Sequence, residues 1–234
     1  MADDGLTRFG LIALATDLTI EGDGAALMPQ GTRLHVTRIA FDNPTTAQNL
    51  RATGPRLAAA AQLLVPGVDL AGIGFGCTSA SAVLGETVQQ AVEGRAPVIT
   101  PTSGALRGFG ALDLRRIALM TPYLAATTDL VGDHFEDRGI TVVSRHSMGH
   151  ADDRDMARLP AGDIIAAARQ ADAPAAQALF LSCTALPALD LIERLEDILG
   201  KPVLTANQAL FWALLDQARI PATGPGALFG LRTW

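Results

Sequence analysis

Short apolar runs rich in β-branched residues alternate along the chain with longer Ala- and Leu-rich stretches of helical periodicity. The short runs predict strands over residues 9–15, 70–76, 117–120, 140–144 and 178–182. The longer stretches predict helices over residues 45–64, 81–92, 125–137, 162–171, 186–199 and 207–217. Alternation of this kind is typical of βαβ units, so we expect an α/β fold with parallel sheets flanked by helices.

The pattern in the first half of the chain returns in the second. Arg-Phe-Gly-Leu-Ile at 8–12 parallels Arg-Ile-Ala-Leu-Met at 116–120, and Gly-Cys-Thr-Ser at 76–79 parallels Ser-Cys-Thr-Ala at 182–185. Pro-Val-Ile-Thr at 97–100 parallels Pro-Val-Leu-Thr at 202–205, and all three pairs lie about 105–108 residues apart. We therefore expect two similar lobes related by a pseudo-two-fold, with the active site in the cleft between them. The expected divisions are a first lobe over 1–112, a second over 113–215, and a segment over 216–234 that packs back on the first lobe.

Composition and charge narrow the class of protein. Of 234 residues, 49% are hydrophobic and 18% charged, which is enough to build a buried core. The net charge of −6 argues against nucleic acid as a partner. The acidic start of the sequence does not match a signal peptide, and charged residues or prolines interrupt the apolar runs. We therefore expect a cytoplasmic protein with no membrane partner and with free thiols.

The two cysteines are the strongest chemical signal. Cys77 and Cys183 each follow a predicted strand at the point where a helix is expected to begin, on the sheet edge where α/β proteins bind ligands. The positive end of a helix favours anions and lowers the pKa of a nearby thiol. The pseudo-two-fold would place the thiols on opposite sides of the cleft, so that one removes a proton from a substrate carbon and the other returns it. We therefore expect both cysteines to be catalytic.

Other motifs are weaker. The Gly-Ile-Gly-Phe-Gly run at 72–76 lacks the third glycine of a dinucleotide loop, and the four histidines lack metal-ligand spacing. We expect neither a cofactor nor a metal. The acidic run at 152–155 predicts the start of a helix, and we expect one of its carboxylates to face the cleft. Tyr123 follows a predicted strand, and position alone fits either packing at the lobe junction or a hydrogen bond to a substrate carboxylate.

At these motifs the chain resembles the aspartate/glutamate racemase superfamily. It is most similar to the branch that holds maleate cis-trans isomerase, arylmalonate decarboxylase and the ectoine-utilisation proteins, over about residues 9–215. The strongest matches are at residues 76–79, 119–124, 182–185 and 201–209. The longer stretch 77–85, together with 152–155, is most similar to the ectoine-utilisation group.

The resemblance implies cofactor-free chemistry on a small carboxylate. It implies that substrate is held by the side chains at Thr78, Ser79, Tyr123, Thr184 and Asn207. Decarboxylases of this branch keep only the second cysteine, so the presence of the first speaks against decarboxylation. Maleate isomerases use the first cysteine as a nucleophile and the second as a proton donor, whereas racemases use both as bases.

Two acidic residues depart from the maleate isomerase pattern. Those enzymes resemble this chain around Asp17 and Asp153 but carry Asn at both positions. An ionised Asp repels a carboxylate and prefers an ammonium or hydroxyl donor. If both residues bind substrate, we expect a substrate with an amino group.

The favoured interpretation is a cofactor-independent isomerase or racemase of a small amino- or hydroxy-carboxylate, acting through Cys77 and Cys183 in ectoine or hydroxyectoine degradation. One alternative is a maleate-type cis-trans isomerase in which Cys77 adds covalently to substrate. A second is a non-catalytic ligand-binding protein of the same pathway. A homo-oligomer is common in this superfamily, but the sequence does not indicate an oligomeric state or the exact substrate.

Overall fold

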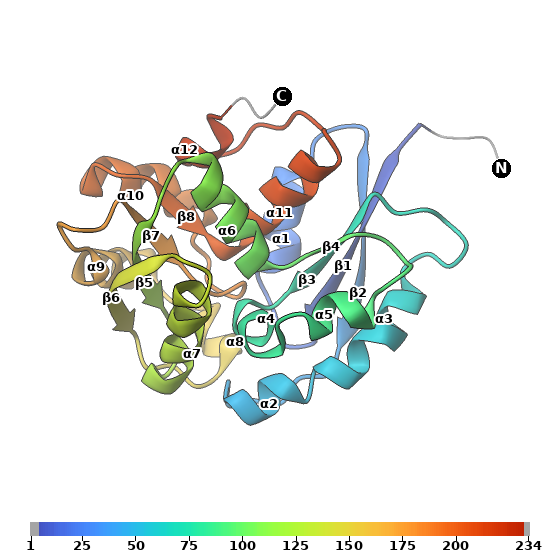
Figure 1. Ribbon diagram of the computed structural model, residues 1–234, viewed down its shortest axis with the longest axis horizontal. Helices are drawn as coiled ribbons and strands as arrows, with labels where there is room; N and C mark the ends of the chain where they lie inside the picture. Colours follow the sequence, from blue (N-terminus) through green and yellow to red (C-terminus); the bar gives the residue numbers. More distant parts are fainter. Residues whose placement is uncertain (1–4, 232–234) are drawn as a thin grey trace.

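The computed structural model describes residues 5–231 and contains two four-stranded parallel sheets (Figure 1). The first sheet has the strand order β2-β1-β3-β4, with strands β1 (Thr7–Leu14), β2 (Thr32–Ile39), β3 (Gly72–Gly76) and β4 (Val98–Ile99). The second has the order β6-β5-β7-β8, with strands β5 (Arg116–Thr121), β6 (Thr141–Ser147), β7 (Ala178–Leu181) and β8 (Val203–Thr205). The two halves thus build the same sheet from strands in the same order, which confirms the α/β fold with two similar lobes.

Helices flank both sheets. The first half contributes α1 (Ile20–Leu27), α2 (Ala47–Arg51), the 3-10 turn η1 (Gly54–Arg56), α3 (Leu57–Leu63), α4 (Thr78–Leu84), α5 (Thr87–Ala91) and α6 (Pro101–Ala111). The second half contributes α7 (Ala125–Glu136), α8 (Asp153–Met156), α9 (Ala161–Ala171), the 3-10 turn η2 (Leu189–Leu191), α10 (Ile192–Leu199), α11 (Ala206–Gln217) and α12 (Gly226–Phe229).

Several elements differ from the sequence prediction. The helix expected over 45–64 is divided, because Gly54 and Pro55 form the 3-10 turn η1 between α2 and α3. The helix expected over 81–92 begins earlier and breaks at Gly85, whose φ of 54° ends α4. The hydrophobic pattern did not predict strands β2, β4 and β8 or helices α1, α6 and α12.

One helix of each half, α6 in the first and α11 in the second, crosses to the other half's sheet. Phe109 of α6 packs edge-to-face on Phe135 and Phe180 of the second half, with ring centroids 5.6 and 5.7 Å apart. Helix α11 packs on β3, where a Cβ at Gly72 would come within 3.0 Å of Leu214. The expected boundary between residues 112 and 113 therefore separates the two sheets, but not the helices that cover them.

The segment after α11 contacts both halves. Leu228 of α12 lies against Gly108 of α6. The backbone N–H of Ala227 donates to Glu196 of α10 at 3.0 Å, and Gln208 of α11 donates to the Pro225 carbonyl at 2.7 Å. The prediction that this segment packs on the first lobe is therefore too narrow, because it also ties α10 and α11 together.

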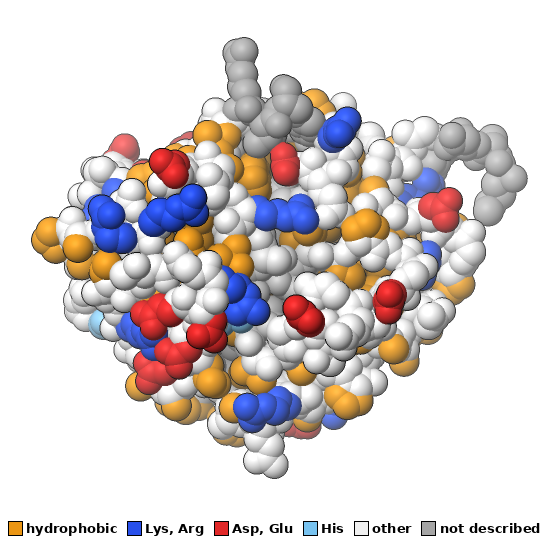
Figure 2. Space-filling model, viewed as in Figure 1, with side chains coloured by type: hydrophobic (Ala, Val, Ile, Leu, Met, Phe, Trp, Pro, Cys, Tyr) orange, Lys and Arg blue, Asp and Glu red, His pale blue; other side chains and the backbone are white. Residues whose placement is uncertain are grey.

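The surface carries charges of both signs. On the face shown in Figure 2, acidic and basic side chains are interspersed, and acidic side chains gather at the lower left, in the region of α7. There Arg145 pairs with Asp129, Asp133 and Glu136 at 3.3, 2.8 and 2.9 Å. Within residues 5–231, no helix has the length and apolar character needed to cross a membrane.

Candidate active site

The carboxyl ends of β3 and β7 meet at a small closed cavity. Its volume is about 10 Å³, enough for about one water molecule. Its lining comes from both halves of the chain: Leu14, Asp17, Phe41, Thr45, Cys77, Ser79, Tyr123, Asp153, Cys183, Thr184 and Ala185. Any ligand of several heavy atoms must push these side chains apart.

Cys77 directly follows β3 and caps α4. Its Sγ accepts a hydrogen bond from the backbone N–H of Ala80 at 3.4 Å and lies 3.7 Å from the Ser79 hydroxyl. Burial raises the pKa of the thiol to about 12, although these two contacts lower it; the carboxyls of Asp17 and Asp153 raise it further. The expected lowering of the thiol pKa by the helix is therefore outweighed by loss of hydration.

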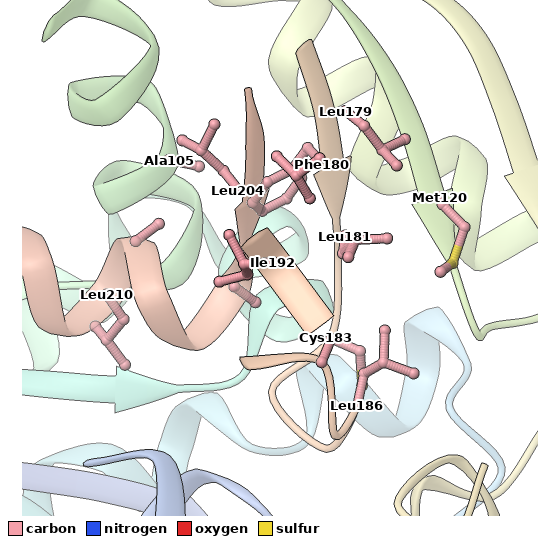
Figure 3. Packing of buried hydrophobic residues seen from close by; sticks show 14 of the residues in the cluster. Ala105, Met120, Leu179, Phe180, Leu181, Cys183, Leu186, Ile192, Leu204 and Leu210 are labelled. Atoms are coloured by element: carbon pink, nitrogen blue, oxygen red, sulfur yellow. The ribbon is translucent and has the colours of Figure 1, made fainter. Parts of the chain in front are cut away.

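Cys183 departs from the expected geometry. It follows Ser182 at the end of β7, but no helix begins there, and the next helical turn starts at Leu189. Its φ of 126° is strained for a residue with a side chain. Figure 3 shows the residue beside Leu186, below Leu181 of β7. Burial raises the pKa of this thiol strongly, while Tyr123 lowers it. The prediction of a helix start is thus wrong for the second cysteine.

Tyr123 is both packed and directed at the cavity, so the two interpretations left open by the sequence are compatible. The residue is 2% exposed. Its backbone carbonyl accepts hydrogen bonds from the Ser147 hydroxyl at 2.6 Å and the Gly149 N–H at 2.9 Å, which fix the turn after β5. Burial raises the pKa of the phenol well above its usual value, so it remains a hydrogen-bond donor.

Asp17 starts helix α1 from inside the cavity. Its Oδ1 accepts hydrogen bonds from the N–H groups of Thr19 at 2.8 Å and Ile20 at 2.9 Å. Burial raises the pKa of its carboxyl, the two backbone hydrogen bonds lower it, and the charge of Asp153 raises it. One oxygen is thus committed to the helix, while the side chain still lines the site.

Asp153, rather than Asp152, faces the cavity. Its Oδ1 accepts a hydrogen bond from Asn43 at 2.8 Å, and its Oδ2 accepts one from the Thr16 hydroxyl. Asp152 caps α8 and pairs with Arg154, and this ion pair lowers the pKa of Asp152 to about 2. The acidic run therefore divides into one buried carboxyl in the site and one on the surface.

The remaining expected residues fall into two groups. Ser79 and Thr184 line the cavity. Thr78 is buried behind it, where its hydroxyl has no partner, and Asn207 also lies outside the lining. Asn207 donates to the Thr184 carbonyl at 2.8 Å and to Asp23 at 2.7 Å. The structure thus gives Asn207 a supporting position beside Thr184.

The sequence did not indicate the segment between β2 and α2. Phe41 and Thr45 line the cavity, and Asn43 holds Asp153. The N–H of Thr45 donates to the Ala151 carbonyl at 2.9 Å, which ties the two halves together over the site. Because β2 was not predicted, its carboxyl end could not be placed on the same edge as the cysteines.

Within residues 5–231, no group of three or more His, Cys, Asp or Glu side chains could hold a metal ion. Both cysteines are free thiols. The groups available for chemistry at the cavity are therefore two thiols, a phenol, hydroxyls and two carboxyls.

Comparisons with known sequences identify relatives. Residues 13–229 match the family model described as arylmalonate decarboxylase. A maleate isomerase of Nocardia farcinica is 29% identical over 241 residues, covering 95% of this chain and 94% of the relative. A maleate isomerase of Pseudomonas putida is 24% identical and covers 95% of this chain and 96% of the relative.

Solved structures agree with this result. A maleate isomerase from Pseudomonas putida with bound maleate superposes with a TM-score of 0.88 at 23% identity, covering 96% of this chain and 97% of the other, which shows the common fold. A cysteine-to-serine variant of the Nocardia farcinica maleate cis-trans isomerase, with a covalently bound succinylcysteine intermediate, has a TM-score of 0.84 at 25% identity and covers 96% and 98% of the two chains. The chain belongs to the arylmalonate decarboxylase family, and its relatives include maleate isomerases.

Proposed function

We propose that the protein is a cysteine-dependent isomerase of small unsaturated carboxylates, with cis-trans isomerisation of the maleate type as its reaction. The observation that carries this proposal is that Cys77 and Cys183, from equivalent positions of the two halves, line one buried cavity. Relatives named maleate isomerase along nearly the whole chain support this reaction over the racemisation that the sequence favoured.

The reaction begins with one thiolate and one thiol. The Sγ of Cys77 forms a bond to one alkene carbon, the π bond breaks, and Cys183 gives its proton to the neighbouring carbon. The former double bond is now single and rotates. Cys183 then takes a proton back, the carbon–sulfur bond breaks, and the double bond re-forms in the trans geometry. Atoms and charge return to their starting values after each turnover.

Hydrogen-bond donors in the lining suit a substrate carboxylate. The hydroxyls of Ser79 and Tyr123 are neutral donors in the lining, and the hydroxyl of Thr184, which donates to the Gly76 carbonyl at 3.3 Å, lies beside them. They would stabilise the negative charge that moves onto the carboxylate as sulfur adds to the alkene. Asn207 supports this set by fixing the carbonyl of Thr184, and Thr78 supports it from behind.

Replacement of each cysteine tests the proposal. Cys77→Ser and Cys183→Ser keep the shape of the side chain but remove its acidity, so each should lower turnover by at least about a hundredfold. Proton NMR of cis-enoates, with circular dichroism as a control for folding, measures the effect. A single variant with near-normal turnover would contradict the two-thiol reaction. Unaltered substrate binding without any turnover in the wild type would favour a ligand-binding protein.

A second candidate is proton transfer at the α-carbon of a small amino- or hydroxy-carboxylate, the racemase reaction that the resemblance to ectoine-utilisation proteins favours. The specific observation for it is the pair of carboxyls in the lining, Asp17 and Asp153, which suits an amino group. In D2O, a racemase exchanges the α-proton of an amino acid for deuterium, whereas a cis-trans isomerase leaves saturated amino acids unlabelled. The same NMR experiment therefore separates the two reactions.

A further inference from the structure

The cavity contains two buried carboxyls that form no ion pair with any of the described residues. Asp17 is 1% exposed and Asp153 is 6% exposed, and they come from different halves of the chain. None of the described residues that line the cavity is an arginine, a lysine or a histidine. Buried carboxylates in folded proteins are normally paired with a positive group, because the loss of hydration is otherwise uncompensated.

The protein supplies only neutral donors to these carboxyls. Asp153 receives hydrogen bonds from Asn43 and the Thr16 hydroxyl, and Asp17 receives them from two backbone N–H groups. Arg38 approaches from outside, but its guanidinium donates to the backbone carbonyl of Asp17 at 2.9 Å and pairs with Glu21 at 2.8 Å. The positive charge that would balance the two side chains is absent from the lining.

The two carboxyls also oppose the chemistry of the thiols. Asp17 and Asp153 both raise the pKa of Cys77, and Asp17 raises the pKa of Cys183. A thiolate formed in this cavity would be a third negative charge in a space of low polarity. A positive group on the substrate would offset this repulsion and favour the thiolate when substrate binds.

We propose that the substrate is a small monocarboxylate that carries an ammonium group, held by Asp17 and Asp153 while its carboxylate faces the hydroxyls of Ser79 and Tyr123. This inference rests on the proposed function for the identity of the site. It restricts that function to zwitterionic substrates and makes a dianion such as maleate a poor ligand, because its second carboxylate would face the carboxyl pair and be repelled.

Three cis-enoates with the same carbon backbone test the proposal. Maleate ends in a second carboxylate, maleamate in a neutral amide, and cis-4-aminobut-2-enoate in an ammonium group. Calorimetry on the Cys77→Ser/Cys183→Ser variant measures binding with turnover blocked. We expect affinity to rise in that order, with the zwitterion bound at least about a hundredfold more tightly than maleate. The wild type should turn over these compounds with the same ranking.

Charge-neutral variants supply the second half of the test. Asp17→Asn keeps an oxygen acceptor for its two backbone donors. Asp153→Asn keeps one for Asn43, and its amide N–H can donate to the Thr16 hydroxyl instead. Both substitutions remove the negative charge. Together they should reverse the ranking, so that maleate binds more tightly than the zwitterion. If the double variant does not fold, Asp153→Asn alone should narrow the difference at least about tenfold. Asp155→Asn is the matched control, because it removes the same charge from an exposed position of α8 outside the lining, and it should leave the ranking unchanged.

The outcomes separate this inference from the proposed function. Maleate binding as tightly as the zwitterion, or a ranking that Asp17→Asn/Asp153→Asn does not move, would overturn the inference and leave the isomerase proposal standing. Tight binding of the zwitterion without isomerisation of any of the three compounds would support the inference and overturn the cis-trans isomerase proposal.

Discussion

Cys77 and Cys183 occupy equivalent positions in the two halves but differ in backbone geometry. Cys77 has an extended backbone with φ of −156° and caps α4, whereas Cys183 has φ of 126° and starts no helix. The Sγ of Cys77 accepts a hydrogen bond from the backbone N–H of Ala80 at 3.4 Å, at the start of α4, whereas Cys183 interacts with the backbone of Ala185 outside any helix. We infer that Cys77 is the nucleophile and that Cys183, next to the phenol of Tyr123, is the proton donor.

Slow alkylation of the resting enzyme is the first prediction. With the pKa of Cys77 raised to about 12, the thiolate is a minor species at neutral pH. The rate of modification by iodoacetamide should therefore rise about tenfold per pH unit between pH 7 and 10. Mass spectrometry of the peptide with Cys77 follows the rate, and urea-unfolded protein is the control. A rate that reaches a plateau below pH 9 in the folded protein would disagree with the burial of this thiol.

Relief of backbone strain at Cys183 is the second prediction. The φ of 126° lies in a region that glycine adopts readily and alanine does not. Cys183→Gly and Cys183→Ala both remove the thiol, so the difference between their free energies of unfolding measures the backbone strain at this position. The glycine variant should be more stable by about 1 kcal/mol in urea unfolding. An alanine variant of equal or greater stability would show that the turn carries no strain.

The crossing of α6 and α11 gives the third prediction. A Cβ at Gly104 of α6 would lie 2.5 Å from the backbone oxygen of Ala209 in α11, which cannot move without shifting the helix. Gly104→Ala should lower the free energy of unfolding by about 2–3 kcal/mol. Gly110→Ala, in the same helix with open space at its Cβ, is the control and should raise stability by about 0.5–1 kcal/mol. Equal effects of the two substitutions would mean that the helices are not in close contact.

The pH dependence of stability is the fourth prediction. Burial raises the pKa of Asp23 to about 6, although the hydrogen bond from Asn207 lowers it. The folded state therefore binds more protons than the unfolded state between about pH 4 and 6, and this carboxyl makes the protein less stable as the pH rises through that window.

Removing the charge of Asp23 should remove this loss of stability with rising pH. Asp23→Asn keeps an acceptor for Asn207 and should raise the free energy of unfolding at pH 7 by about 1–2 kcal/mol, with little change at pH 4. Urea unfolding at both pH values measures this. If Asp23→Asn raises the free energy of unfolding equally at pH 4 and pH 7, the stabilisation comes from packing and not from removal of the charge.

The hydrophobic pattern and the internal repeat predicted the two-lobed α/β fold. Two features that they did not predict, strand β2 and the exchange of α6 and α11, have physical causes. Strand β2 is an edge strand in which polar residues, the exposed Arg33 and Arg38 and the half-buried His35, interrupt the apolar ones, so it lacks a continuous apolar run. The exchange of α6 and α11 depends on contacts between residues about a hundred positions apart, which periodicity does not report.

The same reasoning explains what was predicted of the site. Cys77, Cys183 and their neighbours follow strands, so the carboxyl-end rule brought them to one edge. The rule could not indicate the turn at Cys183. Both cysteines are followed by Thr, but a helix begins after Cys77 and none begins directly after Cys183. Nor could it show that burial outweighs the helix in setting the pKa of Cys77, since burial is a property of both halves together.

The most direct test of the two-thiol account is mass spectrometry of the Cys183→Ser variant after incubation with cis-4-aminobut-2-enoate and, separately, with maleate. In this variant Cys183 no longer supplies the proton, so the carbon next to the new carbon–sulfur bond takes its proton from water. Loss of Cys183 also removes the base that takes the proton back, so the adduct on Cys77 should accumulate. The account predicts a mass increase equal to one whole substrate molecule on the peptide that contains Cys77, and none in the Cys77→Ser variant. An unmodified Cys77 in Cys183→Ser, under conditions where the wild type isomerises the same compound, would contradict it.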